Sequence, residues 1–75
     1  MLQSSVQSSN ILKVFWENET LFITFHGRSD GPRTYRYAAT PVSVYNDLIA
    51  APSVGSHFSK HVKNNFTAEP TQLML

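Results

Sequence analysis

The sequence contains no cysteine, which excludes disulfides and the cysteine-ligated zinc sites that often stabilise small domains. Secreted domains of this length commonly need such cross-links, so their absence favours a reducing, cytoplasmic location. No apolar run approaches the roughly 20 residues of a membrane span. Residues 1–10 have neither the charged start nor the apolar run of a signal peptide. We therefore expect a cytoplasmic protein without a membrane segment.

Charge is also scarce: charged residues make up 15% of the chain and the net charge is only +1. The small positive excess is uneven, because residues 33–66 contain a single acidic side chain, Asp47. The basic residues of that stretch are Arg33, Arg36, Lys60 and Lys63. A strong nucleic-acid binder carries a denser basic stripe than this. The composition is therefore compatible only with weak binding to a polyanion.

Large apolar side chains are well represented. Hydrophobic residues make up 41% of the chain, including five phenylalanines, three tyrosines and one tryptophan. A disordered chain would have fewer of these and more net charge. The length of 75 residues suits one domain. We expect a single domain over residues 1–75, with its core at about 6–66 and an extended tail at 67–75.

Three stretches are typical of strands. Residues 11–17 are apolar but alternate imperfectly, which indicates a bulge or apolar contact on both faces. Residues 20–26 and 33–38 alternate more regularly, and the loop 27–32 separates them. The short connections predict a three-stranded antiparallel meander. A fourth, N-terminal strand near Val6 is the alternative.

The apolar spacing becomes helical after Thr40, which we expect to cap a helix that has Pro41 at its first position. Pro52 ends that helix, and Ser53 is a natural cap for a second one. The second helix repeats an apolar residue every four positions, at Val54, Phe58, Val62 and Phe66. Helices this short are marginal without packing partners. The sequence therefore predicts an α+β fold, with both helices packed on one face of the sheet.

The order of these features is also familiar. The relevant residues are Val6, Ile11, Thr20-Leu21, Ile23, Phe25, Tyr35-Arg-Tyr37, Pro41, Ser43-Val-Tyr45, Leu48-Ile49, Ala51, Ser53, Gly55, Phe58, Val62-Lys63 and Phe66. This series is similar to the KTSC domain and covers about residues 6–66. Two departures stand out: the loop 27–32 is longer than usual, and Phe15 stands where a small residue is typical.

The KTSC resemblance implies a small binding module. The family is named for a C-terminal domain of some lysyl-tRNA synthetases, and it also occurs as a stand-alone protein in bacteria and phages. Attachment to a tRNA synthetase makes RNA the ligand that the resemblance implies. Our leading hypothesis is accordingly binding of RNA or single-stranded nucleic acid through Arg33, Arg36, Lys60 and Lys63. Arginine would supply planar contacts and lysine point charges to phosphates.

The alternative hypothesis is a protein-interaction module. Phe22, Thr24, Thr34 and Arg36 fall on the sheet face opposite the helices, together with Phe15 if the strand is regular there. Phe22 and Arg36 would there contact a protein partner or a second copy of the chain. Equally, the chain's own ends would cover that face, or it would be ordinary surface. We expect a monomer or a weak homodimer.

The two adjacent tyrosine positions, Tyr35 and Tyr37, share the parity of Leu21 and Ile23. We interpret them as core residues with hydroxyls at the sheet edge, rather than as a base-stacking platform. His57 and His61 have metal-like spacing on the second helix, but no further ligand lies nearby in sequence. With Lys60 and Lys63 they are better interpreted as a mildly basic helix surface.

Catalysis finds little support in the sequence. Serines are plentiful, yet none lies in a Gly-x-Ser-x-Gly pattern. Asp47 and Glu69 are not paired with another acid or base. We expect a binding protein and not an enzyme, with no catalytic residue, no cofactor and no metal.

Overall fold

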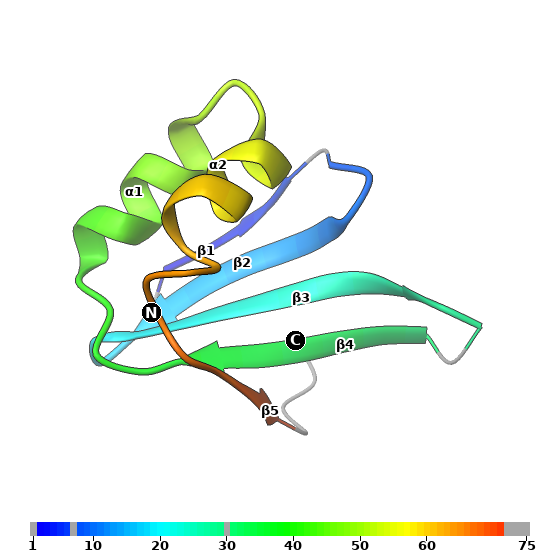
Figure 1. The fold of residues 1–75 in the computed structure, drawn as a ribbon, viewed down its shortest axis with the longest axis horizontal. Helices are drawn as coiled ribbons and strands as arrows, with labels where there is room; N and C mark the ends of the chain where they lie inside the picture. The colour runs from blue at the N-terminus through cyan, green and yellow to red at the C-terminus, as the bar shows by residue number, and fades with distance from the viewer. Residues whose placement is uncertain (1, 7, 30, 72–75) are drawn as a thin grey trace.

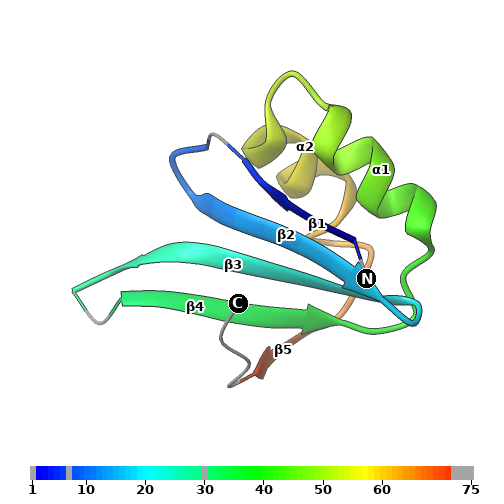
Figure 2. The same cartoon turned by 180° about the vertical axis from the view of Figure 1, so that it is seen from behind.

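The computed structural model describes residues 2–6, 8–29 and 31–71. Its elements, in chain order, are β1 Leu2–Ser5, β2 Ile11–Glu17, β3 Thr20–Arg28, β4 Gly31–Tyr37, α1 Val42–Ala50, α2 Val54–His61 and β5 Ala68–Thr71 (Figure 1). The strands form one sheet in the order β1-β2-β3-β4-β5. Every neighbouring pair is antiparallel. Both helices lie on the same side of the sheet, as the two opposite views show (Figures 1 and 2).

The expected fold class is confirmed: a meander of β2, β3 and β4 is followed by two helices on one face. The N-terminal strand that we allowed for is β1, which lies just before Val6. The structure adds β5, which we had assigned to the extended tail. Its sequence, Ala-Glu-Pro-Thr, gives little sign of a strand. Pro70 is tolerated there because β5 is an edge strand, where one backbone donor is not needed.

A bulge in β2 explains the imperfect alternation. Ile11 pairs with Phe25 and Lys13 pairs with Thr24, so Leu12 is an extra residue in the ladder. Ile11 and Val14 consequently both point into the core below the helices, and Leu12 is exposed. The bulge is the first of the two explanations that the sequence offered.

Two hairpin turns use backbone conformations with positive φ. Asn18 and Glu19, which join β2 to β3, have φ values of 51° and 59°. Two such residues in succession match the twist of a tight antiparallel hairpin. Gly27, near the β3–β4 turn, has a φ of +73°, and an added Cβ would lie 1.8 Å from the carbonyl oxygen of Gly31. Only glycine fits that position.

Thr40 does not cap α1, which corrects our expectation. The helix begins at Val42, and Pro41 is its N-cap residue without a side-chain hydrogen bond. The Thr40 hydroxyl instead donates to the carbonyl oxygen of Tyr37 at 2.9 Å. Its amide donates to the Glu19 carbonyl at 2.8 Å, and its carbonyl accepts from the Trp16 indole at 2.8 Å. The residue is fully buried, so its hydroxyl is used within the packed interior and does not cap the helix.

Ser53 caps α2 as expected, because its side chain accepts from the backbone of Ser56 at 3.4 Å. The core lies between the helices and the sheet, where α2 contributes Val54 and Phe58. The other fully or nearly buried core residues are Ile11, Val14, Leu21, Ile23, Tyr37, Tyr45, Leu48 and Val62.

The opposite sheet face holds a second buried group. Phe15 is only 2% exposed and stacks on Phe22, with ring centroids 4.6 Å apart and planes 17° from parallel. Beside them, the hydroxyls of Thr24 and Thr34 are 2.8 Å apart and buried. The register confirms that these residues share this face with Arg36. We call Phe15, Phe22, Thr24 and Thr34 the outer-face cluster.

The hydroxyl pair in the outer-face cluster gives a stability prediction. Thr24→Val should lower the free energy of unfolding by about 1–3 kcal/mol, because it leaves the buried Thr34 hydroxyl without its partner. The double variant Thr24→Val/Thr34→Val should cost less than the sum of the two single changes. Urea unfolding of the four proteins measures this coupling. Purely additive costs would show that the hydroxyls do not depend on each other.

Candidate functional site

A cleft of about 560 Å³ opens on the helix side of the sheet, between α2 and the strands β3 and β4. The cleft exists because two short helices cannot cover five strands. α1 packs over β2, and the part of β3 and β4 nearer their hairpin has no helix above it (Figure 1). The volume lies within the roughly 300–1,000 Å³ range of small-ligand pockets.

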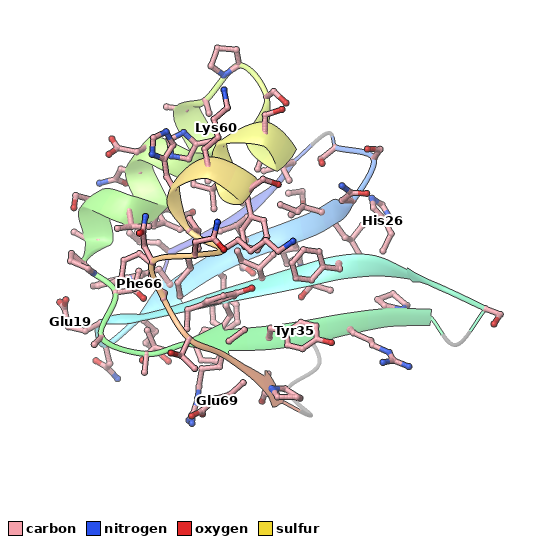
Figure 3. All side chains as sticks on the ribbon, in the orientation of Figure 1. Glu19, His26, Tyr35, Lys60, Phe66 and Glu69 are labelled. Carbon is pink, nitrogen blue, oxygen red and sulfur yellow. The ribbon has the colours of Figure 1, made fainter. Side chains whose placement is uncertain are left out.

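Four aromatic rings form the apolar floor of this cleft: Phe25, Tyr35, Tyr37 and Phe58. Phe25 meets Tyr35 edge-to-face at 5.7 Å and Phe58 at 5.4 Å between centroids. Tyr37 meets Phe58 in the same manner at 6.0 Å. Tyr37 and Phe58 are buried at the base, whereas Phe25 and Tyr35 are half-buried. Figure 3 shows Tyr35 on β4 with no helix over it. We call these four rings the aromatic floor.

Two cations border the aromatic floor from different elements. Arg33 comes from β4 and Lys63 from the turn after α2, and both are exposed. None of the described residues that line the cleft is acidic. The described lining of the cleft therefore places basic side chains beside apolar surface.

The rim of the cleft is a short loop, residues 8–10, fastened to β3. The Ser8 hydroxyl accepts hydrogen bonds from the backbone of Asn10 at 3.2 Å and of Ile11 at 3.3 Å. The His26 amide donates to the Asn10 carbonyl at 3.0 Å. The His26 ring Nε2 lies 3.2 Å from the Ser8 carbonyl, to which it donates (His26 is labelled in Figure 3). This rim is therefore ordered by the neighbouring strand.

A second cavity of about 520 Å³ adjoins the first. The two cavities share Ser9, Asn10, Gly55 and Ser59 in their walls, so they adjoin along α2, and we call the two together the groove. Lys60 borders the second cavity together with several serine hydroxyls. At Gly55 the loop and α2 approach closely, since an added Cβ would lie 3.3 Å from the Ser8 hydroxyl.

The structure separates the cations that the sequence analysis grouped. Arg33 and Lys63 meet at the aromatic floor, and Lys60 borders the adjoining cavity. Arg36 lies on the opposite face of the sheet, where it forms a salt bridge with Glu69 of β5 (Glu69 is labelled in Figure 3). Both side chains of that pair are about half exposed, at 49% and 53%. A single ligand in the groove would not reach Arg36.

Phe22, the other proposed partner contact, is half-buried in its stack with Phe15. The sequence analysis did not name Phe25, Phe58, His26 or Asn10 as site residues. The alternation in β3 and the four-residue spacing in α2 had marked the two phenylalanines as core. Their apolar pattern carries no signal that the core is open on this side.

The two helix histidines are close, with ring centroids of His57 and His61 4.5 Å apart. Across residues 2–6, 8–29 and 31–71, no group of three or more His, Cys, Asp or Glu side chains is arranged to hold a metal. Over the same residues, no helix is long and apolar enough to cross a membrane.

Tyr37, at the buried end of the aromatic floor, has a raised pKa. Burial, helped by the charge of nearby Tyr35, raises the pKa of Tyr37 from 10.0 to about 12. Loss of water around the phenolate is the main cause. Tyr37 is 3% exposed, which agrees with its expected place in the core, whereas Tyr35, which we had also assigned to the core, is half-buried and lines the cleft.

The sequence model described as the KTSC domain matches residues 7–66. The fold is similar to the crystal structure of a KTSC domain protein from Yersinia pestis, with a TM-score of 0.79 and 29% sequence identity. That alignment covers 93% of this chain and 96% of the other. A comparison with the curated proteins found no match.

The Tyr37 pKa predicts how stability responds to alkali. The neutral phenol is favoured in the folded state, so its contribution is complete below pH 10 and is lost as pH rises from about 10 towards 12. Tyr37→Phe should remove this part of the alkaline loss. Absorbance titration near 295 nm should show a step near pH 12 that the variant lacks. A step retained by Tyr37→Phe would assign it to another tyrosine.

Proposed function

This chain belongs to the KTSC domain family, and from that premise we propose that it is a non-catalytic module that binds RNA or single-stranded DNA in the groove along α2. The observation that carries the proposal is the pairing of an aromatic floor with Arg33 and Lys63 at its border. Proteins that bind single strands combine these two features, since rings stack on bases and cations contact phosphates.

The charge arrangement supports a polyanion as the ligand. Arg33 of β4 and Lys63, just after α2, line the cleft, and Lys60 of α2 lines the adjoining cavity. Phosphate neutralisation by so few cations gives weak binding that falls with salt. This fits the low net charge of +1.

Binding without chemistry is the simplest account of the groove. Its described lining holds serine hydroxyls, one histidine and two tyrosines, but no carboxylate and no cysteine. The His26 Nε2 is engaged with the Ser8 carbonyl and does not activate a serine hydroxyl. Without a nucleophile and its base in contact, the arrangement offers no route to covalent catalysis.

The outer sheet face supports the protein-docking alternative less well. The Phe15 and Phe22 rings use their faces on each other, and Phe15 is nearly inaccessible at 2% exposure. Arg36 is paired with Glu69. A partner docking there would gain little apolar area from Phe15 and would have to compete for the guanidinium.

The salt dependence of binding tests the proposal. Lys60→Ala/Lys63→Ala should weaken binding of a fluorescent single-stranded oligonucleotide, measured by anisotropy between low and moderate salt. If both lysines contact phosphates, the slope of log K against log salt should become shallower by about 1.4. Alanine favours helices, so α2 should be preserved.

The matched control removes the same charge from the other face. Lys13 pairs with Thr24 in the sheet, and therefore lies on the outer side with Arg36. Lys13→Ala/Arg36→Ala should leave the slope nearly unchanged. Equal losses of affinity in the two double variants would show that the phosphates do not bind specifically in the groove. Absence of binding by the native protein at low salt would refute the nucleic-acid proposal.

A further inference from the structure

We propose that the cleft accepts one unpaired nucleobase on its aromatic floor, and that the adjoining cavity receives the neighbouring phosphate. This inference rests on the proposed function and specifies it. In this proposal the domain recognises nucleobases that are not stacked in a nucleic-acid duplex, and does not bind through the phosphate backbone alone.

The geometry of the rings carries the first step. All three ring pairs of the aromatic floor are edge-to-face, at 72–77° between planes. The stacked pair of the molecule, Phe15 and Phe22, lies on the opposite sheet face. Rings that meet edge-to-face leave a π-face available to a third, flat group. Tyr35 and Phe25 line the cleft and are only half-buried, so part of each ring is accessible to such a group.

The polar rim supplies groups that suit the edges of a base. The structure records hydrogen bonds for the backbone of Asn10, whereas its exposed amide side chain has none among the described residues. An amide presents two donors and an acceptor. Ser59 stands across the cleft on α2 with an exposed hydroxyl. These groups flank the aromatic floor, where the edge of a stacked base would lie.

The continuation of the groove carries the second step. A nucleotide with its base on the aromatic floor has a phosphate on either side. Arg33 and Lys63 border the same cleft, and Ser59 lies in the walls of both this cleft and the cavity bordered by Lys60. Serine hydroxyls at Ser53 and Ser56 line that cavity. Hydroxyl donors and a lysine together suit a phosphate better than a second base.

A base can enter this cleft only if it is unpaired. The cleft lies between α2 and the strands β3 and β4, so a base inside it would present its edges to the protein rim in place of a Watson–Crick partner. Extrusion from a duplex carries an unstacking cost that single strands largely avoid. The groove should therefore prefer single-stranded loops and ends over a continuous duplex.

The test compares native oligonucleotides with abasic ones of equal length and equal phosphate count. Anisotropy at low salt is measured for labelled ribo- and deoxyribo-octamers, the abasic octamer, and a blunt duplex. The abasic octamer and the duplex should each bind roughly 5- to 150-fold more weakly than the native single strand, the range expected for loss of one stacked base. The ribo and deoxy arms establish which sugar is preferred.

Variants at Tyr35 locate the base. Tyr35→Leu should weaken binding of the native octamer by a similar factor and leave the abasic octamer unaffected, whereas Tyr35→Phe should retain the native affinity. Circular dichroism and thermal unfolding establish that each variant is folded. The oligonucleotide comparison uses the unmodified protein, so it stands even if Tyr35→Leu does not fold.

The two proposals fail in different ways. Equal, salt-sensitive binding of the native and abasic octamers would overturn the base site and leave the phosphate-binding module in place. Absence of binding by every octamer would overturn both. A base-dependent affinity that Tyr35→Leu does not change, in a folded variant, would refute the aromatic floor as the base site.

Discussion

The fold depends on the buried connection at Thr40, where the sheet ends and the helices begin. This residue is hydrogen bonded through its amide to the β2–β3 turn, through its hydroxyl to the end of β4, and through its carbonyl to the Trp16 indole. It therefore fixes where α1 starts above the sheet. Because α1 is then held over β2, the short α2 that follows leaves the hairpin end of β3 and β4 uncovered. The open cleft is a consequence of this anchoring.

The two faces of the sheet use aromatic residues differently. On the outer face, Phe15 and Phe22 stack on each other and a threonine pair closes the polar gap beside them, so the rings stabilise the sheet. On the inner face, Phe25, Tyr35 and Phe58 meet at their edges beside exposed cations. The same residue type thus stabilises the sheet on one face and leaves ring surface accessible in the cleft on the other.

Sequence patterns were sufficient to locate most strands and helices, but not to predict which part of the sheet the helices leave uncovered. Alternation and helical spacing located β3, β4 and both helices, since each pattern reports which residues face a core. β5 was missed because Ala68, Glu69 and Pro70 have low strand propensity, and pairing with β4 overrides it. The role of Thr40 was missed because a threonine before a proline has the same local signature whether it caps or is buried. Arg33 and Arg36 alternate along one strand, so one faces the cleft and the other faces away, a distinction that charge counting along the chain does not make.

The last strand gives the fold an order of assembly. Each pairing from β1 to β4 joins neighbours along the chain, whereas β5 returns to β4 only after both helices, bringing Ala68 beside Tyr37. Closing that longer loop costs more chain entropy than any hairpin. Low contact order elsewhere favours rapid folding of the meander. Ala68 of β5 is part of the wall of the cleft. This wall is therefore complete only after the meander and both helices have formed.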